Sequence, residues 1–301
     1  MVFALMAGFV IVTTMSALRS PMNPLLGVST TTTTSQAIPA GTGGSPQQAG
    51  GPADRGPGIQ PASPWLNALL ATALRTALKT HPGLLAVGVI DETTGQQALY
   101  APTRHFSSGD IVTADILAAL LVRQQSASAP AASGMGVLAT AMMQHGNGPA
   151  AANLWRAIGE GNGLVSANRL LKLTQTIPGA GDQWNQTTTT VADQLQLLID
   201  LTSSRSPLTA AHQHYMLQLM GGRSTHLPWG VPPIGAVKAV QDGWLAHGSA
   251  WLTNSIGIVA RAHHELIVAV LSSVSTSRAA GLSLASAAAL AAADVMTTPG
   301  S

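Results

Sequence analysis

The sequence predicts an α+β fold: a five-stranded antiparallel sheet flanked by helices from the N- and C-terminal parts of the chain, with an inserted all-helical subdomain. Strand-like runs lie within residues 84–100 and 240–273. Between them, residues 110–219 have a helical apolar pattern that polar, Gly- and Pro-rich segments interrupt. Because strands from both ends of the folded region must pair to complete one sheet, the helical stretch is expected to form a block beside it.

The first predicted helix begins at Ser63 and Pro64, an N-cap residue followed by proline at the first helical position. Apolar residues then recur at helical spacing, namely Trp65, Leu66, Leu69, Leu70, Ala73, Leu74 and Leu78. Residues 84–90 and 96–100 are predicted strands joined by a turn at 91–95.

The helical stretch that follows is expected to break at four segments, residues 126–134, 145–149, 159–163 and 177–186. Three further strands are predicted at residues 240–246, 250–260 and 266–273, with turns at 247–249 and 261–265. A helix over residues 281–296 closes the domain. We expect the first and last helices to lie on one face of the sheet.

Residues 1–18 are predicted to be a signal peptide or an N-terminal membrane anchor, because no residue from Val2 to Leu18 carries a charge. Residues 19–62 are rich in Pro, Gly, Ser and Thr and predict a disordered linker. The folded domain is then expected over residues 63–296, with its helical subdomain at about 104–225 and a tail at 297–301. This organisation predicts an extracytoplasmic protein, secreted or membrane-anchored.

Composition argues against several kinds of function. The formal net charge of +2 comes without a cluster of Lys and Arg, so nucleic acid is not an expected partner. The chain has no cysteine, which removes disulfides, thiolate catalysis and cysteine metal sites. His212 and His214 are two residues apart on a predicted helix and point to different sides, and His263 and His264 are expected to be solvated in a turn. No metal or other cofactor is therefore expected.

Motifs for phosphate loops, dinucleotide binding, zinc proteases and G-x-S-x-G hydrolases are missing from the sequence. Candidate chemistry is confined to three polar clusters: Asp110 with Thr113, residues 145–147 (HGN) and residues 241–243 (QDG). Asp110 begins a predicted helix, where a carboxylate can instead serve as a cap for backbone N–H groups. The candidate residues of a ligand-binding cleft are Asp110, Thr113, His145, Asn147, Gln241, Asp242 and Gly243.

Several blocks of sequence, in this order, resemble the penicillin-recognising serine hydrolases, and in particular the class A β-lactamase-like exported proteins of actinobacteria. The blocks are FSSGDIVTADILAALL (106–121), MMQHGNGPAAANLWRAIG (142–159), TTTTVADQLQLL (187–198), WGVP (229–232) and QDGWLAHGSAWLTNSIGIVA (241–260). The likeness extends over roughly residues 63–296. It implies a β-lactamase/transpeptidase-like fold.

In that family an S-x-x-K motif supplies the nucleophile and a lysine, S-D-N a second serine, and K-[TS]-G a lysine that holds the substrate carboxylate. The resemblance puts Asp110 and Thr113 at the positions of the first serine and lysine. It puts residues 145–147 at S-D-N, retaining only Asn147, and residues 241–243 at K-[TS]-G, retaining only Gly243. Both serines and both lysines are thus replaced, and serine acylation is not expected.

Neighbouring residues do not supply these groups. Ser107 and Ser108 have no lysine three residues further on, and an Asp110 carboxylate would repel a carboxylate-bearing β-lactam. In the loop where the resemblance implies a glutamate that activates water, Asp182 and Gln186 are four residues apart. We interpret Asp182 as an ordinary loop acid.

Three functions remain open. We favour a catalytically inactive domain of the cell envelope whose cleft binds a peptidoglycan peptide or an envelope protein. The first alternative is a hydrolase in which Asp110 and His145, on opposite lips of the cleft, activate water. The second alternative is a structural interaction protein with a vestigial cleft, which filling of the cleft by Trp184, Trp229 or Trp244 would favour.

Overall fold

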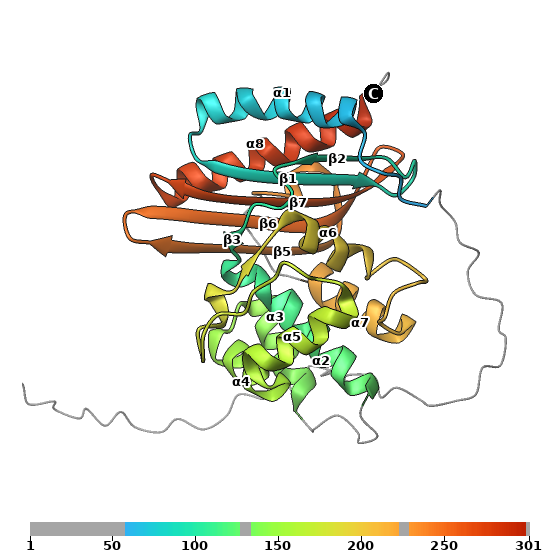
Figure 1. Ribbon diagram of the computed structural model, residues 1–301, viewed down its shortest axis with the longest axis vertical. Coiled ribbons are helices and arrows are strands. Elements are labelled where there is room, and N and C mark those ends of the chain that lie inside the picture. The colour runs from blue at the N-terminus through green and yellow to red at the C-terminus, as the bar shows by residue number, and fades with distance from the viewer. Residues whose placement is uncertain (1–57, 127–133, 223–228, 299–301) are drawn as a thin grey trace, which may run out of the picture. The chain divides into compact units, whose positions relative to one another are not determined.

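A five-stranded antiparallel sheet, with the strand order β2-β1-β7-β6-β5, separates two groups of helices in the computed structural model (Figure 1). The structure describes residues 58–126, 134–222 and 229–298, which lie in one compact unit. The strands of the sheet are β1 (Leu84–Asp91), β2 (Gln97–Tyr100), β5 (Ala236–His247), β6 (Ala250–Arg261) and β7 (His264–Ser275). The α+β class and the single sheet agree with the sequence prediction.

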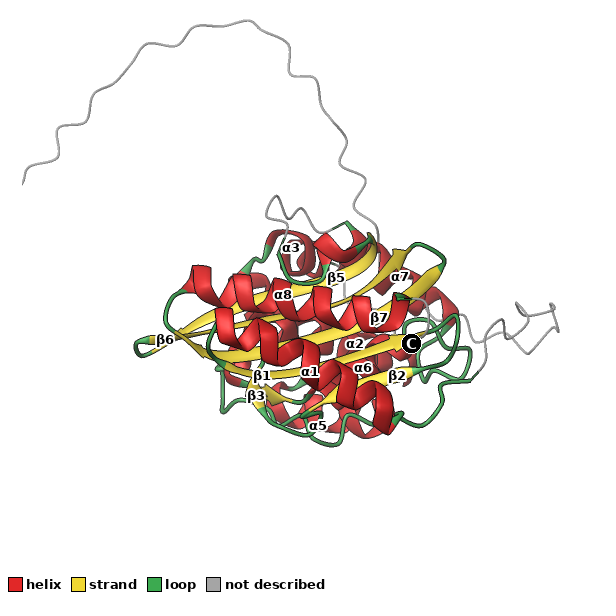
Figure 2. Cartoon of the chain, turned by 90° about the horizontal axis from the view of Figure 1, so that it is seen from above, coloured by secondary structure: helices red, strands yellow, loops and turns green. Residues whose placement is uncertain are grey.

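Helices α1 (Pro64–Thr80) and α8 (Arg278–Thr297) pack on one face of this sheet, as predicted. Figure 2 shows them side by side across the strands. Helix α1 begins at the predicted cap, because the Ser63 hydroxyl accepts a hydrogen bond from the Leu66 N–H. Of the described helices, only α8 is long and apolar enough to span a membrane; its Ala288 and Ala292 are buried against the sheet, so we interpret it as a core helix.

The helical subdomain covers the opposite face of the sheet (Figure 1). Its helices are α2 (Val112–Ser126), α3 (Met135–His145), α4 (Gly148–Ile158), α5 (Glu160–Leu171), α6 (Val191–Ile199) and α7 (Ala210–Gly221). Helix α6 packs directly on β1 and β7. This close approach requires Gly88 on β1, since a Cβ atom there would lie 2.5 Å from Leu195 Cδ1 of α6.

Alternation along the strands divides the apolar residues between two core layers. On β7, Leu266, Val268 and Val270 face α1 and α8, whereas Ile267 and Ala269 face the helical subdomain. Helix α2 crosses the second layer, and every residue from Val112 to Val122 is buried. The lack of exposed positions explains why this stretch is apolar on all sides apart from Thr113 and Asp115.

The structure corrects the prediction at three places. Two-residue strands β3 (Phe106–Ser107) and β4 (Thr188–Thr189) pair in a small second sheet, which has no detectable period in the sequence. The predicted break at 159–163 is reduced to Gly159, because α5 already begins at Glu160. Strands β5, β6 and β7, and helix α8, extend beyond their predicted bounds, and the predicted turn at 261–265 is wrong at Arg261, His264 and Glu265, which lie in strands.

Several predictions concern residues outside the described part of the chain. These are the signal peptide or anchor at residues 1–18, most of the linker at 19–62, the core of the predicted break at 126–134, and the last three residues of the tail. Residues 58–62 are described and have no regular secondary structure.

Candidate functional site

The three polar clusters identified in the sequence meet at the N-terminal end of α2. The 3₁₀ turn η1 (Gly109–Ile111) carries Asp110, the α3–α4 connection carries residues 145–147, and β5 carries residues 241–243. Four of the seven candidates line one small cavity: Asp110, Thr113, Asn147 and Gln241. Met142, Gly146, Gly148, Ala151 and Trp184 complete its wall.

Two residues fix the position of η1 against the sheet. Gly243 of β5 allows the close approach, because a Cβ atom there would lie 2.7 Å from the Asp110 nitrogen and 2.8 Å from the Ile111 nitrogen. Buried Asn254 of β6 donates its amide N–H groups to the carbonyls of Ser107 (2.8 Å) and Ser108 (2.9 Å). Asn254 was missed in the sequence; it lies in a run of three polar residues, 253–255, between the apolar parts of β6, and this run is the signal that marks it.

The polar groups of the cavity are bonded to the local backbone. The Thr113 hydroxyl donates to the Asp110 carbonyl at 2.7 Å, the local bond that threonine commonly makes in a helix. The Gln241 amide donates to the same carbonyl at 3.4 Å. Gln241 is 1% exposed, and its Oε1 has no hydrogen-bond partner among the described residues. The site therefore holds a buried acceptor that one ordered water could satisfy.

Asn147 lines the cavity while serving as a helix cap: its side-chain oxygen accepts from the Ala150 N–H at 2.8 Å and begins α4. His145 is exposed and does not line the cavity. The expected pairing of Asp110 with His145 across one cleft therefore finds no support, since only Asp110 contributes to the wall.

Asp242 and Gly243 do not line the cavity either. Successive residues of a strand point to opposite faces, so Asp242 leaves the side on which Gln241 lies. Its carboxylate accepts a hydrogen bond from the Ser255 hydroxyl, and Asp242 is 1% exposed. We therefore correct the prediction for Asp242: it belongs to the buried contacts between β5 and β6, and Gly243 acts through its backbone alone.

The neighbouring serines are held by other contacts. Ser108 is fully buried, and its hydroxyl donates to the Thr187 carbonyl at 2.8 Å. The Ser107 hydroxyl donates to the Asn185 carbonyl at 3.4 Å. None of the described residues that line the cavity is a serine, lysine or arginine.

The lysines of the chain lie elsewhere. They are Lys79, Lys172 and Lys238. Lys79 is exposed at the end of α1 and Lys172 is exposed at the end of α5. Lys238 of β5 forms an ion pair with Glu265 at 2.6 Å. The described lysines thus contribute no base or carboxylate-binding group to the cavity.

The cavity is almost filled by side chains. Its volume is about 10 Å³, and Met142 and the half-buried Trp184 form part of the wall. A volume of about 10–15 Å³ is what a single water molecule requires. A β-lactam or a peptide therefore cannot enter this cavity without displacing its wall. The other two tryptophans lie elsewhere: Trp229 is buried in the core layer under α8, and Trp244 is 42% exposed.

Trp244 packs in an aromatic cluster at the free end of the β5–β6 hairpin. Its ring centroid lies 5.7 Å from that of Trp251, and the Arg278 guanidinium lies 4.8 Å from the Trp244 ring centroid. This cation–π contact joins α8 to the hairpin.

The loop before β4 is held by structural contacts. Asp182 is exposed and forms an ion pair with Arg156 at 3.3 Å. Trp155 is fully buried and donates its indole N–H to the Gly181 carbonyl at 2.8 Å. Gln186 is exposed in the 3₁₀ turn η2 (Trp184–Gln186) and does not line the cavity.

The buried carboxyl of Asp115 lies in the first turn of α2. The pKa of Asp115 is raised to about 7, chiefly by burial and to a smaller extent by the neighbouring Asp193, against a hydrogen bond from Gln194 that lowers it. The Gln194 amide donates to both Asp115 oxygens, at 3.2 and 3.3 Å. Asp115 is 1% exposed and does not line the cavity, so its titration affects stability rather than the cleft.

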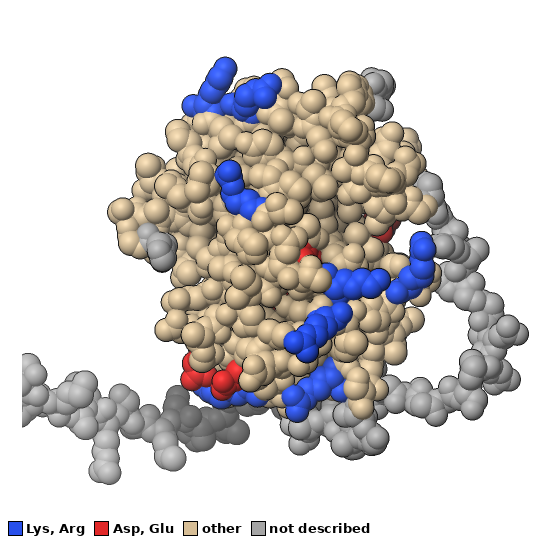
Figure 3. Space-filling view, viewed as in Figure 1, with Lys and Arg blue, Asp and Glu red and all other residues tan. Residues whose placement is uncertain are grey.

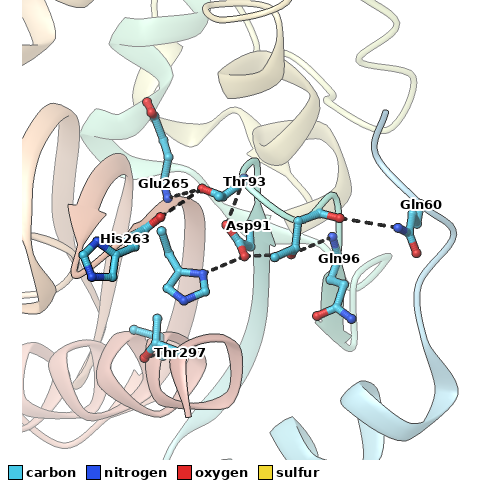
Figure 4. A network of polar contacts seen from close by, with 10 residues as sticks. Gln60, Asp91, Thr93, Gln96, His263, Glu265 and Thr297 are labelled. Atoms are coloured by element: carbon cyan, nitrogen blue, oxygen red, sulfur yellow. Dashed lines mark hydrogen bonds and ion pairs between the residues drawn. The ribbon is translucent and has the colours of Figure 1, made fainter. Parts of the chain in front are cut away.

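The histidines differ in their surroundings. His212 is buried and bonds through Nδ1 to Gln125 Oε1 at 2.7 Å, whereas His214 is exposed, as their spacing predicted. His264 was expected to be solvated, but it begins β7 and its Nδ1 lies 2.8 Å from Asp91 Oδ2. Figure 4 shows Asp91 at the centre of this network. Among the described residues, no group of three His, Asp or Glu side chains has a geometry suited to a metal ion.

Comparison by sequence finds no matching family model and no matching curated protein. Comparison by structure finds a β-lactamase from Xanthomonas campestris pv. campestris, with a TM-score of 0.65, 19% identity, and coverage of 77% of this chain and 98% of the other. A β-lactamase from Burkholderia phymatum has a TM-score of 0.65, 15% identity and coverage of 77% and 99%. A protein named PBP-A has a TM-score of 0.64, 13% identity and coverage of 79% and 98%. The β-lactamase/transpeptidase-like fold is thereby confirmed.

Proposed function

We propose that this chain is a β-lactamase-fold protein of the cell envelope that has lost serine acylation and acts by binding through surfaces other than the cleft. The observation that carries the proposal is the filled cavity at the N-terminal end of α2. Its wall contains Asp110 and Thr113, the residues that the sequence resemblance aligns with the nucleophile and the lysine. A volume of about 10 Å³ leaves no room for a substrate.

The hydrogen bonds of the cavity wall support the loss of serine acylation. Acylation needs a hydroxyl with a neighbouring base that accepts its proton. The one hydroxyl of the cavity wall belongs to Thr113, and it donates to the Asp110 carbonyl. A carbonyl oxygen is not a base at neutral pH, so this contact holds the hydroxyl without activating it.

The size of the cavity also favours one of two binding hypotheses. A peptidoglycan peptide in the cleft would have to displace Trp184 and Met142, and so we disfavour the cleft as its site. A structural interaction protein with a vestigial cleft fits the observations better. Its location in the envelope rests on the uncharged segment from Val2 to Leu18 and is part of the same proposal.

The first experiment measures acylation of the purified full chain by a fluorescent penicillin, with intact-mass spectrometry as the readout. We expect no covalent adduct. An adduct of the penicillin mass on the native chain would overturn the proposal, and its position would identify the true nucleophile.

A variant distinguishes a cleft that lacks the reactive groups from a cleft that has them but is closed. Trp184→Gly removes the largest side chain of the wall and opens the cavity. If the reactive groups are missing, this variant also remains unlabelled. Labelling of the variant alone would mean that the cleft is only closed, and the proposal would then fail. Gln183→Gly, at the exposed neighbouring position, is the matched control.

A further inference from the structure

A groove of about 410 Å³ lies between α2 and α5 in the helical subdomain, apart from the filled cavity. Ligand sites in proteins usually have volumes of about 300–1,000 Å³. The floor and walls are largely apolar and include Ala119 and Val122 of α2 and Ala167 and Leu170 of α5. Leu170 is 55% exposed and adds apolar surface to the groove.

The tight connection from α4 to α5 explains the groove. Gly159 joins the two helices with a positive φ of 93°, and Gly163 lies so close to the Ile158 carbonyl that a Cβ atom would be only 1.8 Å from its oxygen. Neither position can carry a side chain, and both line the groove. The segment that the sequence suggests as a helix break thus leaves a hollow beside α2.

Arg123 supplies one cationic group to this apolar groove. Its Nη1 donates to the Ile158 carbonyl at 2.8 Å, which holds the side chain at the end of α4. A guanidinium has five N–H donors, so this bond leaves others available. Within the described parts of the chain, no carboxylate forms an ion pair with Arg123. Glu160, at the start of α5, does not line the groove.

We propose that this groove binds a small apolar molecule that carries one carboxylate. The hydrocarbon part lies against Ala119, Val122 and Leu170, and the carboxylate accepts hydrogen bonds from Arg123. On the face drawn in Figure 3, basic side chains gather over the helical subdomain, which favours an anion. Arg123 lies ten residues beyond Thr113 on α2, about 15 Å along the helix, so this site is distinct from the cleft.

The test uses the purified full chain and two probes of equal chain length, decanoate and decylammonium, below the concentrations at which they form micelles. We expect isothermal titration calorimetry to show saturable binding of one decanoate per chain. Binding of decylammonium is expected to be at least about tenfold weaker, because its head group repels Arg123. Absence of saturable decanoate binding, or equal binding of both probes, would overturn the proposal.

Two variants locate the site. Arg123→Gln removes the charge, and Ser166→Trp places an indole at the exposed rim of the groove. Each is expected to weaken decanoate binding by about tenfold or more. Arg169→Gln, on α5 but outside the groove, is the control and should bind as the native chain does.

Circular dichroism checks that each variant is folded. Should Arg123→Gln not fold, because it loses the bond to Ile158, Ser166→Trp decides on its own. Unchanged decanoate affinity in folded Ser166→Trp would overturn the proposal, since an indole at this rim fills the site. None of these readouts depends on the cleft, so the proposal can fail while the proposed function stands.

Discussion

At the scale of single residues, the polar groups around the N-terminal end of α2 serve the fold. Thr113 and Gln241 bond to the backbone of η1, and Asn254 holds the two residues before it. The Thr113 bond is local, but the bonds of Gln241 and Asn254 could not be predicted from the sequence, because they join positions 131 to 147 residues apart and leave no local period. Asp115 and Asn254 give two residue-scale tests.

The first prediction concerns Asp115. Its folded pKa of about 7 lies above the ordinary value of 3.8. Below about pH 4 the carboxyl is protonated in both states; as pH rises toward 7, only the unfolded chain releases the proton, so stability falls. Asp115→Asn removes this pH-dependent loss of stability, because asparagine does not titrate. The amide N–H of the new asparagine can also donate to Gln194 Oε1, which has no partner among the described residues. We expect the variant to be more stable by about 3 kcal/mol at pH 8.

The measurement is urea unfolding of the native chain and Asp115→Asn at pH 4.5, 6 and 8. The gain should grow with pH and be smallest at pH 4.5. A gain that is independent of pH would show that packing, rather than titration of Asp115, changed. Asp182→Asn is the matched control, because this carboxylate is exposed and its removal should change stability little.

The second prediction concerns Asn254. Asn254→Ala removes the side-chain bonds to the buried Ser108 carbonyl, the part-buried Ser107 carbonyl and the Ser272 N–H, and we expect a loss of about 3 kcal/mol in the free energy of unfolding. Asn147→Ala is the matched change at an exposed helix cap and should cost only about 1 kcal/mol. Urea unfolding compares them. Equal losses would contradict the role that we assign to Asn254.

At the scale of elements, β5 and η1 pack closely together beside the cavity. Gly243 is what allows β5 to press against the backbone of Asp110 and Ile111. The sequence resemblance aligned this glycine with the family's K-[TS]-G motif, and the strand and its turn could be predicted from alternation and turn residues. Trp184 was one of three tryptophans named as candidates to fill the cleft, but its place in the cavity wall could not be predicted, because a short 3₁₀ turn in a loop has no periodic pattern.

The third prediction tests this contact. Gly243→Val places side-chain atoms within about 3 Å of the η1 backbone, and we expect a loss of stability of about 3 kcal/mol from overpacking. Gly148→Ala is the control, since nothing lies within 4 Å of its Cβ position and α4 favours alanine. Thermal unfolding should show a lower Tm for Gly243→Val only. A native Tm for that variant would mean that η1 is free to move away from β5.

At the scale of the whole molecule, the order of elements was predictable, while contacts between distant segments were not. The continuous apolar run of β7 and the apolar spacing of α1 predicted the sheet and its helical layer from local pattern alone. The pairing of His264 with Asp91 joins residues 173 positions apart, so the sequence suggested only a solvated histidine. The separation of the two core layers by one sheet likewise emerges only when all strands are assembled.

The last prediction concerns the cooperativity of unfolding. A chain of this length with a helical subdomain could unfold in two steps. The two layers are nevertheless built from alternate residues of the same strands, so the loss of either exposes the sheet that the other requires. Leu121→Ala, in the helical-subdomain layer, and Leu284→Ala, under α8, should each lower stability by about 3 kcal/mol. Far-UV circular dichroism and tryptophan fluorescence should shift together in both variants, whereas a separate early transition in either would show that the layers unfold independently.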